Sequence, residues 1–479
     1  MHLLLDGRGP LHAQLTRALK TAMVAGRVSQ GSRLPPTRLL ARELGVSRNT
    51  VLTAYEQLRA EGFVDGRIGS GSYATLPLLT VAANDPQPLT SQPQSNFSRR
   101  GRIVHDHARI PGRRVDGVRY AFQYGMPLVN PALATAWARE LAHAAAYTSP
   151  NYPYTQGLPA LREAVCDYLA RRRGVQATPD DVLIVNGTQQ AMALTARVLL
   201  NEGDRVAVEE PQYFAMRELL QIHGAHLTGV PVDAEGLCCD ALPSRSPQLI
   251  YVTPSHQFPS GSVLSLSRRM ELLQYARHNQ SWIFEDDYDG EFRYDSQPLA
   301  ALRSLDHDGR VIYVGTFSKT LFPALRLGYL VMPAALRQDF ITAKWTQDFG
   351  SAPIEQAALA SLMANGGFER HLRRASKILR ERRAALLDGL RALSAGRLEI
   401  ADSRAGMHLV AWLRDKNAAD GEAMIAHGQR LGLGLHSIRP HYLDPPDRAG
   451  LLMGYGGMSV TEIQEALVLF SRCLDAAYA

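Results

Sequence analysis

Four short apolar segments, each followed by a polar turn and then by a helical pattern, place the strongest constraint on the fold of this chain. They span residues 181–186, 206–210, 249–253 and 282–287. Strands that alternate with helices form a parallel sheet, and such sheets bind ligands at the carboxyl ends of their strands. We therefore expect an α/β domain whose site lies in the loops after these segments.

A lysine, Lys319, follows a fifth apolar run in a turn that also holds Thr316 and Ser318. It is one of only five lysines among 52 basic residues. An amine at a strand end can lose its hydration, which lowers its pKa and makes it a nucleophile toward aldehydes. Arg326 and the two hydroxyls are placed to hold a phosphate nearby. The alternative is that the lysine extends into water, as most lysines do.

The other strand ends supply the remaining parts of a pyridoxal phosphate site, in chain order. Gly187 and Thr188 form a turn before a helix, where free backbone N–H groups can bind an anion. Tyr213 follows the second segment and could stack on a flat ring. Asp286 ends the fourth segment, and a pyridinium nitrogen needs such an anion to stay protonated. Tyr288 could donate a hydrogen bond to the phenolic oxygen of the ring.

Together, these segments resemble the fold-type I aminotransferases over about residues 120 to 475. The resemblance implies that the lysine forms a Schiff base with pyridoxal phosphate, that a smaller C-terminal α+β domain follows the sheet, and that the protein is a homodimer. Carried over by position, the cofactor-binding residues of the family fall on Lys319, Asp286, Tyr288, His256, Tyr213, Gly187, Thr188, Thr316, Ser318, Arg326 and Tyr152. The last of these matches a tyrosine that reaches the phosphate from the neighbouring subunit.

One position departs from the aminotransferase pattern. Leu452 stands where these enzymes usually carry the arginine that pairs with the substrate carboxylate. A leucine cannot form a bidentate ion pair, so turnover of α-amino acids is in doubt. Arg439 is close enough in sequence to take over this role. The loop that contains His256 and Gln257 also lacks the Asn-Pro sequence common in the enzymes.

The first 75 residues have a different pattern, that of a small helical domain followed by a hairpin. Apolar residues at every fourth position predict a first helix with a stripe formed by Leu11, Leu15, Leu19 and Met23. Thr37 is expected to cap a second helix that runs to Leu44, and Ser47 is expected to cap a third. The expected buried residues of the third helix are Val51, Tyr55 and Leu58. Residues 63–73 predict a two-stranded wing around a Gly turn.

Helix, short turn and helix is the arrangement of helix-turn-helix domains. The residues at the start of the third helix can reach base edges and phosphates, and here they are Ser47, Arg48, Asn49 and Thr50. Contacts to the DNA backbone are expected from Arg33, Arg38, Arg42 and Arg67. Residues 1–75 hold ten Lys/Arg and five Asp/Glu, whereas residues 117–479 hold 36 and 38. A solvated face explains each arginine alone, but this concentration of basic charge favours nucleic acid.

Residues 44–51 and 55–62 are similar to GntR-type winged helices. A winged helix joined to an aminotransferase-like domain resembles the MocR/GabR family of bacterial transcriptional regulators over nearly the whole chain. The resemblance implies a winged helix-turn-helix DNA-binding domain in residues 1–75 and an aminotransferase-like domain that binds pyridoxal phosphate in residues 117–479.

Residues 76–116 are expected to form a flexible linker, because prolines among polar residues and a basic run cannot build a core. The cysteines match no metal spacing and no CxxC pair, which predicts reduced thiols in the cytoplasm and no metal; they are Cys166, Cys238, Cys239 and Cys473. We expect no signal peptide and no membrane helix, because the apolar stretches are too short.

These observations predict a dimeric, cytoplasmic transcriptional regulator that binds operator DNA. Its sensor would be pyridoxal phosphate held by Lys319, which would report the abundance of the cofactor or respond to an amine or amino acid effector. Two alternatives stay open. A working aminotransferase is the first, and Leu452 argues against it. The second is a DNA-binding protein with a degenerate, cofactor-free domain, against which the complete set of aldehyde-binding residues argues.

Overall fold

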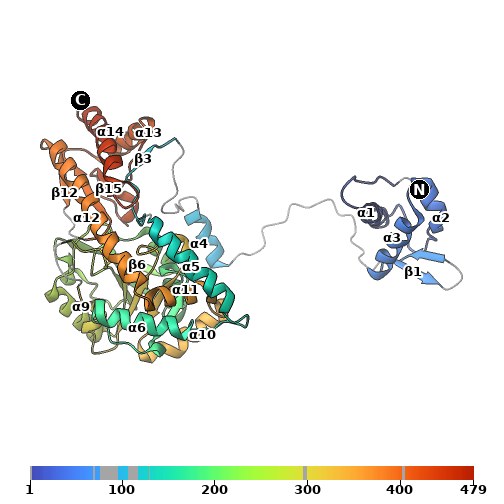
Figure 1. Cartoon of the computed structure of the whole chain (residues 1–479), viewed down its shortest axis with the longest axis horizontal. Coiled ribbons are helices and arrows are strands. Elements are labelled where there is room, and N and C mark those ends of the chain that lie inside the picture. Colours follow the sequence, from blue (N-terminus) through green and yellow to red (C-terminus); the bar gives the residue numbers. More distant parts are fainter. Residues whose placement is uncertain are drawn as a thin grey trace. The chain divides into compact units, whose positions relative to one another are not determined.

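The computed structural model describes residues 3–67, 71–75, 95–105, 117–128, 130–294, 299–401 and 405–479 (Figure 1). The chain forms two compact units, residues 1–93 and 94–479. No helix in the described ranges is both long enough and apolar enough to cross a bilayer.

The N-terminal unit is a helical domain with a hairpin. Its helices are α1 (Leu11–Val24), α2 (Thr37–Leu44) and α3 (Arg48–Ala60), and its antiparallel strands are β1 (Val64–Arg67) and β2 (Gly71–Ala74). One side of each helix is apolar and packs inward, as expected of amphipathic helices. The core is built from residues of all these elements, including Leu15, Leu19, Leu40, Val51, Leu58 and Val64. The predicted helix-turn-helix and wing are confirmed.

Three details of this unit test the predicted helix stripes and caps. Ser47 caps α3, because its side chain accepts a hydrogen bond from the backbone N–H of Thr50. Thr37 does not cap α2, since it is already the first helical residue and Pro36 occupies the cap position without a side-chain hydrogen bond. Leu11 is 48% exposed although it belongs to the predicted stripe. It lies in the first turn of α1, so the core reaches only the later positions.

The C-terminal unit contains an eight-stranded sheet with the order β4-β11-β10-β9-β8-β5-β6-β7. The strands are β4 (Val182–Val185), β5 (Arg205–Glu210), β6 (His226–Asp233), β7 (Gly236–Leu237), β8 (Leu249–Val252), β9 (Trp282–Asp287), β10 (Val311–Thr316) and β11 (Gly328–Val331). Neighbours from β6 to β10 pair in parallel, whereas β11 is antiparallel to both β10 and β4. The predicted strands therefore lie in the sheet, and three members were not predicted: β6, and the antiparallel strands β7 and β11.

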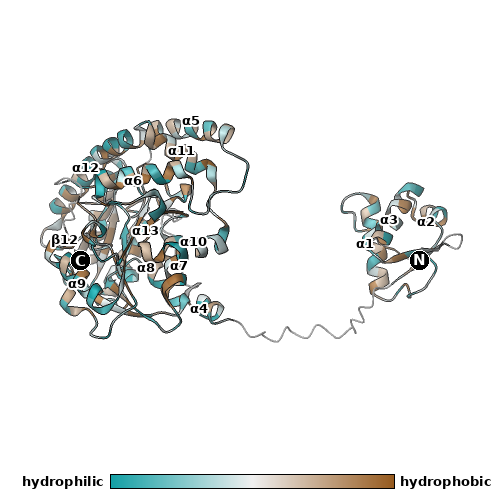
Figure 2. Ribbon diagram, turned by 90° about the horizontal axis from the view of Figure 1, so that it is seen from below, coloured by the Kyte–Doolittle hydropathy of each residue, from teal (hydrophilic) through white to brown (hydrophobic). Residues whose placement is uncertain are grey.

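Helices cover both faces of this sheet. Ile184 and Tyr313 pack in one apolar cluster, while their neighbours Leu183 and Val314 pack in another, because successive strand residues point to opposite faces. Residues of α7 (Thr188–Leu199), α8 (Phe214–His223) and α10 (Arg337–Asp348) contribute to the second cluster. The first cluster receives residues from α5 (Pro131–Tyr147), α6 (Pro159–Arg173), α11 (Pro353–Ala364) and α12 (Gly367–Ser394). These helices carry hydrophobic and hydrophilic residues side by side (Figure 2).

A smaller α+β part follows, as predicted. Its antiparallel strands are β12 (Leu398–Ala401), β13 (His408–Leu413) and β15 (Gly450–Gly454), in the order β12-β13-β15. They pack with α12, α13 (Ala418–Arg430) and α14 (Val460–Tyr478). A short parallel pair, β3 (Tyr120–Ala121) with β14 (Leu433–Gly434), joins an early segment of the unit to this part. The remaining helix, α9 (Leu266–Asn279), lies between β8 and β9 in the chain.

One segment of the predicted linker is a helix, α4 (Asn96–His105). Arg100 forms an ion pair with Glu202, and its guanidinium also donates to backbone carbonyls at the end of α8. Asn96 donates to the same carboxylate. Residues 95–105 therefore belong to the C-terminal unit. The guanidinium of Arg100 is occupied by these contacts, so Arg100 is not a solvated linker residue and is not free to contact a phosphate. The rest of the predicted linker lies outside the described residues.

Candidate functional site

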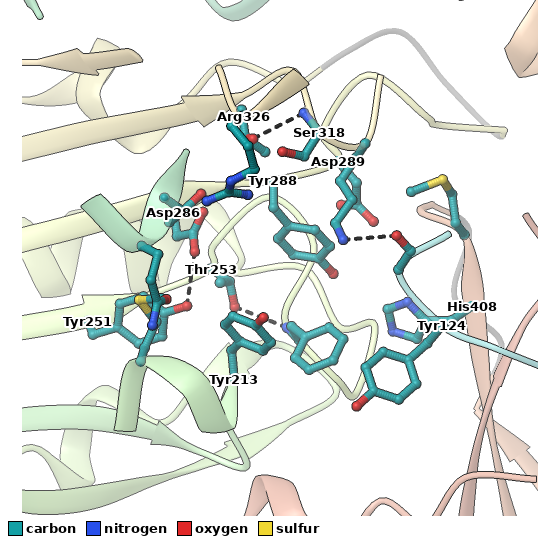
Figure 3. A pocket seen from close by; sticks show the side chains of 18 residues that line it. Tyr124, Tyr213, Tyr251, Thr253, Asp286, Tyr288, Asp289, Ser318, Arg326 and His408 are labelled. Atoms are coloured by element: carbon teal, nitrogen blue, oxygen red, sulfur yellow. Dashed lines mark hydrogen bonds between the residues drawn. The ribbon is translucent and has the colours of Figure 1, made fainter. Parts of the chain in front are cut away.

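A cavity lies where the parallel strands end at their carboxyl termini (Figure 3). Its volume is about 140 Å³, roughly ten times the space that one water molecule needs. Most of the predicted cofactor residues line it: Lys319, Asp286, Tyr288, Tyr213, Thr188, Thr316, Ser318 and Arg326. They come from segments that follow β4, β5, β9 and β10 and precede β11, so the fold brings together residues that are far apart in the sequence.

Lys319 reaches this cavity from the turn after β10. Its ammonium donates to the backbone carbonyl of Gly125 at 3.0 Å. Burial lowers the pKa of the amine, although the carboxylates of Asp289 and Asp286 act in the opposite direction. A side chain at position 125 would displace the amine, because a Cβ there would lie 2.9 Å from the amine nitrogen. A desolvated amine with little freedom of movement can act as a nucleophile.

Asp286 provides the strongest test of whether the site fits pyridoxal phosphate. Tyr251 donates a hydrogen bond to one carboxylate oxygen at 3.0 Å. The other oxygen, Oδ1, is buried and has no partner among the described residues. Burial raises the pKa of this carboxyl to about 7. A buried acceptor without a donor is costly, and the protonated nitrogen of a pyridine ring would satisfy it. The residues present therefore fit the cofactor.

The opposite end of the cavity is suited to an anion. Thr188 is the first residue of α7, so the free N–H groups of the helix start face this end. Arg326 lines the same region, and Ser318 donates its backbone N–H to Thr316 Oγ1 at 3.1 Å. Gly187 has a φ of 81°, and guanidinium atoms of Arg326 lie 3.0 Å from the place where a Cβ would stand. A larger residue at 187 would thus displace the arginine.

Three predicted residues do not line the cavity. His256 lies behind Tyr288, whose hydroxyl is 2.9 Å from its Nδ1, and it contacts Asp289 at 3.0 Å. Gly187 supports Arg326 from outside the cavity. Tyr152 is 91% exposed, and its ring is 6.3 Å from that of Phe349. A tyrosine that serves a neighbouring subunit would be exposed in one chain, so the role of Tyr152 stays a prediction.

Other cavity residues were missed: Tyr124, Gly125, Gln189, Met216, Tyr251, Thr253, Phe258, Asp289, Met407 and His408. Tyr251 could have been found, because it lies on a strand predicted to neighbour the one with Asp286, and in the structure it pairs with Phe284. Thr253 supports Glu209, to which its hydroxyl donates at 2.6 Å. Burial raises the pKa of Glu209 to about 7. Tyr124 and His408 come from distant segments with no pattern that marks them.

In the part of the chain that the structure describes, no arginine lines the wall where a substrate carboxylate would bind. Leu452 is fully buried in β15 and packs with Phe258, which lines the cavity. Arg439 does not replace it, because its guanidinium donates to the carbonyl of Pro446 and the residue does not line the cavity. His408 lines this wall and donates from Nε2 to the carbonyl of Pro259 at 3.1 Å. Burial holds the pKa of His408 well below its usual value, so the ring is neutral.

The N-terminal unit presents polar side chains at the start of α3. Arg48 and Asn49 are exposed in its first turn, and Arg38 is exposed on α2. Ser47 and Thr50 contact each other, with 2.8 Å between their hydroxyl oxygens. Arg67 ends β1, and its side chain lies outside the described part of the chain. The structure thus brings together the start of α3 and the exposed side of α2, whereas it does not test a contact of Arg67.

Comparison with known proteins gives the same division of the chain. The family of aminotransferases of class I and II matches residues 125–427, and the gntR family of bacterial regulatory proteins matches residues 11–73. A probable rhizopine catabolism regulatory protein, MocR of Rhizobium meliloti, is 37% identical over 96% of this chain and 93% of its own length.

Solved structures resemble the C-terminal unit. An α-aminoadipate aminotransferase of Thermus thermophilus, complexed with a phosphopyridoxyl-leucine, is 27% identical, with a TM-score of 0.69 over 76% of this chain and 93% of that chain. A kynurenine aminotransferase of Pyrococcus horikoshii is 25% identical, with a TM-score of 0.69 over 81% of this chain and 95% of that chain. The cofactor of this domain is pyridoxal phosphate. The chain belongs to the MocR-type regulators, in which a GntR-family domain precedes an aminotransferase class I and II domain.

Proposed function

We propose that this protein is a transcriptional regulator that binds operator DNA through α3 and holds pyridoxal phosphate at Lys319 as its sensor. The observation that carries this proposal is the arrangement of Lys319 and Asp286 in one cavity, with a carboxylate oxygen that has no donor among the described residues. When bound, pyridoxal phosphate supplies an aldehyde that condenses with amines and a pyridinium ring that withdraws electrons. The exposed Arg48 and Asn49 of the same chain supply the DNA-binding surface.

Each cavity residue has a proposed task that follows from its position. Lys319 would hold the aldehyde carbon of the cofactor, and Asp286 would accept a hydrogen bond from the protonated pyridine nitrogen. Tyr213 flanks the ring, and Tyr288 contacts its phenolic oxygen with support from His256. The phosphate is bound by the remaining set, namely Gly187, Thr188, Thr316, Ser318, Arg326 and, from a second copy of the chain, Tyr152.

The effector that fits this cavity is pyridoxal phosphate itself or an amine without an α-carboxylate. Among the described residues, the only lysine or arginine side chains that line the cavity are Lys319 and Arg326, and both have tasks at the cofactor. The far wall is formed by Tyr124, Phe258 and neutral His408, none of which pairs with a carboxylate. An amine that condenses at the lysine position would displace it and change the packing around the cavity, which can bias DNA binding if the two states differ.

Leu452 and Arg439 weigh against sustained transamination as the main role. The first is an apolar residue that packs with Phe258 of the cavity wall, and the second is bound to a carbonyl outside the cavity. A homodimer in the cytoplasm is part of this proposal. Two copies of α3 suit a palindromic or repeated operator, and Tyr152 would complete the site of the other copy.

A pair of matched ligands tests the proposal. The purified protein is titrated with phenethylamine and with phenylalanine, which differ by one carboxylate, while visible absorbance and binding to its own upstream DNA are recorded. The expected result is a spectral change with the amine at lower concentration than with the amino acid, together with a change in DNA affinity. Rapid, repeated amino-group transfer from phenylalanine to a keto acid would instead support an enzyme.

A further inference from the structure

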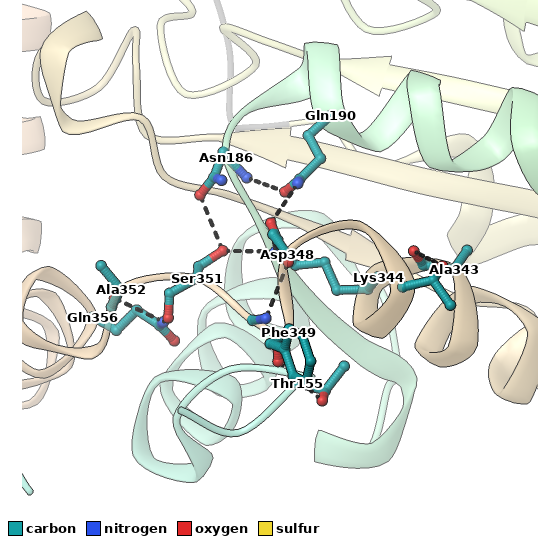
Figure 4. A network of polar contacts seen from close by, with 12 residues as sticks. Thr155, Asn186, Gln190, Ala343, Lys344, Asp348, Phe349, Ser351, Ala352 and Gln356 are labelled. Atoms are coloured by element: carbon teal, nitrogen blue, oxygen red, sulfur yellow. Dashed lines mark hydrogen bonds and ion pairs between the residues drawn. The ribbon is translucent and has the colours of Figure 1, made fainter. Parts of the chain in front are cut away.

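An ion pair between Lys344 and Asp348 lies on α10 (Figure 4), and the Asp348 side chain is 25% exposed. The ammonium of Lys344 is 2.9 and 2.7 Å from the carboxylate oxygens of Asp348 and 3.0 Å from the hydroxyl of Ser351. The side chain of Lys344 is fully buried. A pair with a buried lysine contributes little net stability, because the loss of hydration of the ammonium offsets the attraction. Its presence therefore calls for a reason other than stability.

The pair is connected to Asn186, the residue before the Gly187 turn. Asp348 accepts a hydrogen bond from the side-chain amide of Gln190 at 2.7 Å. The carbonyl oxygen of the Gln190 side chain in turn accepts the backbone N–H of Asn186 at 2.8 Å. On the other side, the hydroxyl of Ser351 donates to the side-chain oxygen of Asn186 at 3.0 Å. Asn186 is thus held at two atoms by groups that both contact the ion pair.

A third atom of Asn186 reaches the cavity. Its backbone carbonyl accepts a hydrogen bond of 2.7 Å from the guanidinium of Arg326. Gly187 and Thr188, which begin α7, follow directly in the chain. The two elements suited to an anion, the guanidinium and the helix start, therefore both depend on the position of Asn186. A shift of Asn186 would move both of them relative to the bound phosphate.

We propose that Lys344 and Asp348 are positioning residues for the phosphate end of the cofactor. The inference rests on the proposed function and adds to it two residues that do not touch the ligand. The charged pair fixes Gln190 and Ser351, these fix Asn186, and Asn186 sets the direction of Arg326 and of the first turn of α7. This network contributes to affinity for the phosphate group of the cofactor and does not contribute to affinity for its aldehyde.

Comparison of pyridoxal phosphate with pyridoxal separates these two contributions, because pyridoxal has the same ring and aldehyde but no phosphate. The variant is Asp348→Asn, and dissociation constants for both ligands are measured by equilibrium dialysis. We expect the preference for pyridoxal phosphate over pyridoxal to fall about tenfold, since a bond to a charged group is weakened by misplacement of its partner. Affinity for pyridoxal should stay unchanged.

A second variant and a control guard against a general loss of structure. Ser351→Ala removes only one bond to Asn186 and should lower the preference less than Asp348→Asn does. Asp306→Asn is the control, because Asp306 is also a carboxylate in an ion pair, with Arg303, and makes no contact with Asn186. An equal loss of affinity for both ligands in Asp348→Asn, or an unchanged preference, would overturn the inference. Failure of the wild-type protein to bind pyridoxal phosphate would instead refute the proposed function.

Discussion

The N-terminal unit leaves the described arginines of its helices in water, whereas the C-terminal unit buries the carboxylates that line its cavity, Asp286 and Asp289. Arg38 and Arg48 are exposed on helices whose opposite sides form the core. Asp286 is only 5% exposed, and the side chain of Lys344 is not exposed at all. Both units use a similar kind of scaffold for their polar groups, since in each the backbone elements are fixed by apolar packing.

The difference follows from what each unit has to bind. Exposed arginines keep their charge and can replace the counterions of a long polyanion, at a cost that depends on salt. Buried groups lose hydration, which shifts pKa values and prepares them for chemistry with a small ligand. The comparison implies that substitutions in the cavity should change chemistry and stability but spare basal DNA binding, and that substitutions in α3 should do the reverse.

The largest effect is expected from Lys319→Ala. Loss of the only lysine in the cavity, as far as the structure describes it, should abolish the visible absorbance of bound cofactor and leave no pyridoxyl adduct after borohydride reduction. Basal binding to operator DNA should persist, because the N-terminal unit has its own core. Lys377→Ala, on an exposed position of α12, is the control and should keep the colour. A pyridoxyl adduct found on another lysine by mass spectrometry would contradict the assignment of Lys319 as the lysine that binds the cofactor.

The second effect concerns stability and pH. In the cofactor-free protein, burial raises the pKa of Asp286 to about 7 from an ordinary value of 3.8. The folded state then binds this proton more tightly than the unfolded state, so the contribution of Asp286 to stability is greatest below about pH 4 and declines as pH rises to 7. Asp286→Asn removes this decline. At pH 8 the variant should be more stable by on the order of 3 kcal/mol.

Urea unfolding of both proteins at pH 5 and pH 8 measures this difference. The exposed Asp167→Asn on α6 is the control and should unfold like the wild-type protein at both pH values. If the free energy of unfolding depended on pH in the same way in the wild-type and Asp286→Asn proteins, burial would not shift the pKa of this carboxyl.

The third effect lies in the other unit. Arg48→Ala should weaken operator binding by roughly 1–3 kcal/mol, the range for a side chain that contacts a base edge or a phosphate. Arg59→Ala is a matched control, because Arg59 is in the last turn of the same helix, about 16 Å away along its axis. Fluorescence anisotropy at several salt concentrations gives both affinity and salt dependence. An equal loss of DNA affinity in the two variants would mean that Arg48 contributes to DNA binding only through the net charge of the domain.

The smallest effect is expected from Tyr152→Phe, about tenfold in affinity for pyridoxal phosphate, because it removes one hydrogen bond from an uncharged hydroxyl to the phosphate. Tyr154→Phe, also exposed, is the control. Mixed dimers show whether Tyr152 acts on the other subunit. In a dimer of one Tyr152→Phe chain and one Lys319→Ala chain, the site with the lysine receives an intact tyrosine and should recover its affinity. No recovery after mixing would place Tyr152 outside the partner site.

Much of the sheet and eight of the 18 cavity residues were predictable, because local patterns determine them. Thr188, Asp286 and Lys319 each directly follow or end an apolar strand, and the rule that parallel sheets bind ligands at strand ends places them together. The cap by Ser47 was equally local. Features of this kind can be predicted from the residues next to them in the sequence.

The missed features depend on contacts between distant segments. Tyr124 and His408 lie far from the strand motifs in sequence and reach the cavity only through the packing of the smaller α+β part. Arg100 looked like part of a linker, since nothing near it in sequence reveals its ion pair with Glu202. Leu11 shows the same limit for a helix, because its position in the stripe does not reveal where the core ends.

The most direct test of the central claim couples the two units in one experiment. Pyridoxal phosphate is titrated into the cofactor-free protein in the presence of labelled upstream DNA, with visible absorbance and DNA affinity measured in the same samples, for the wild-type protein and for Lys319→Ala. Our account predicts that DNA affinity changes in parallel with the absorbance of lysine-bound cofactor in the wild-type protein. The variant should show neither this absorbance nor a change in DNA affinity. The same change of DNA affinity in both proteins would contradict it.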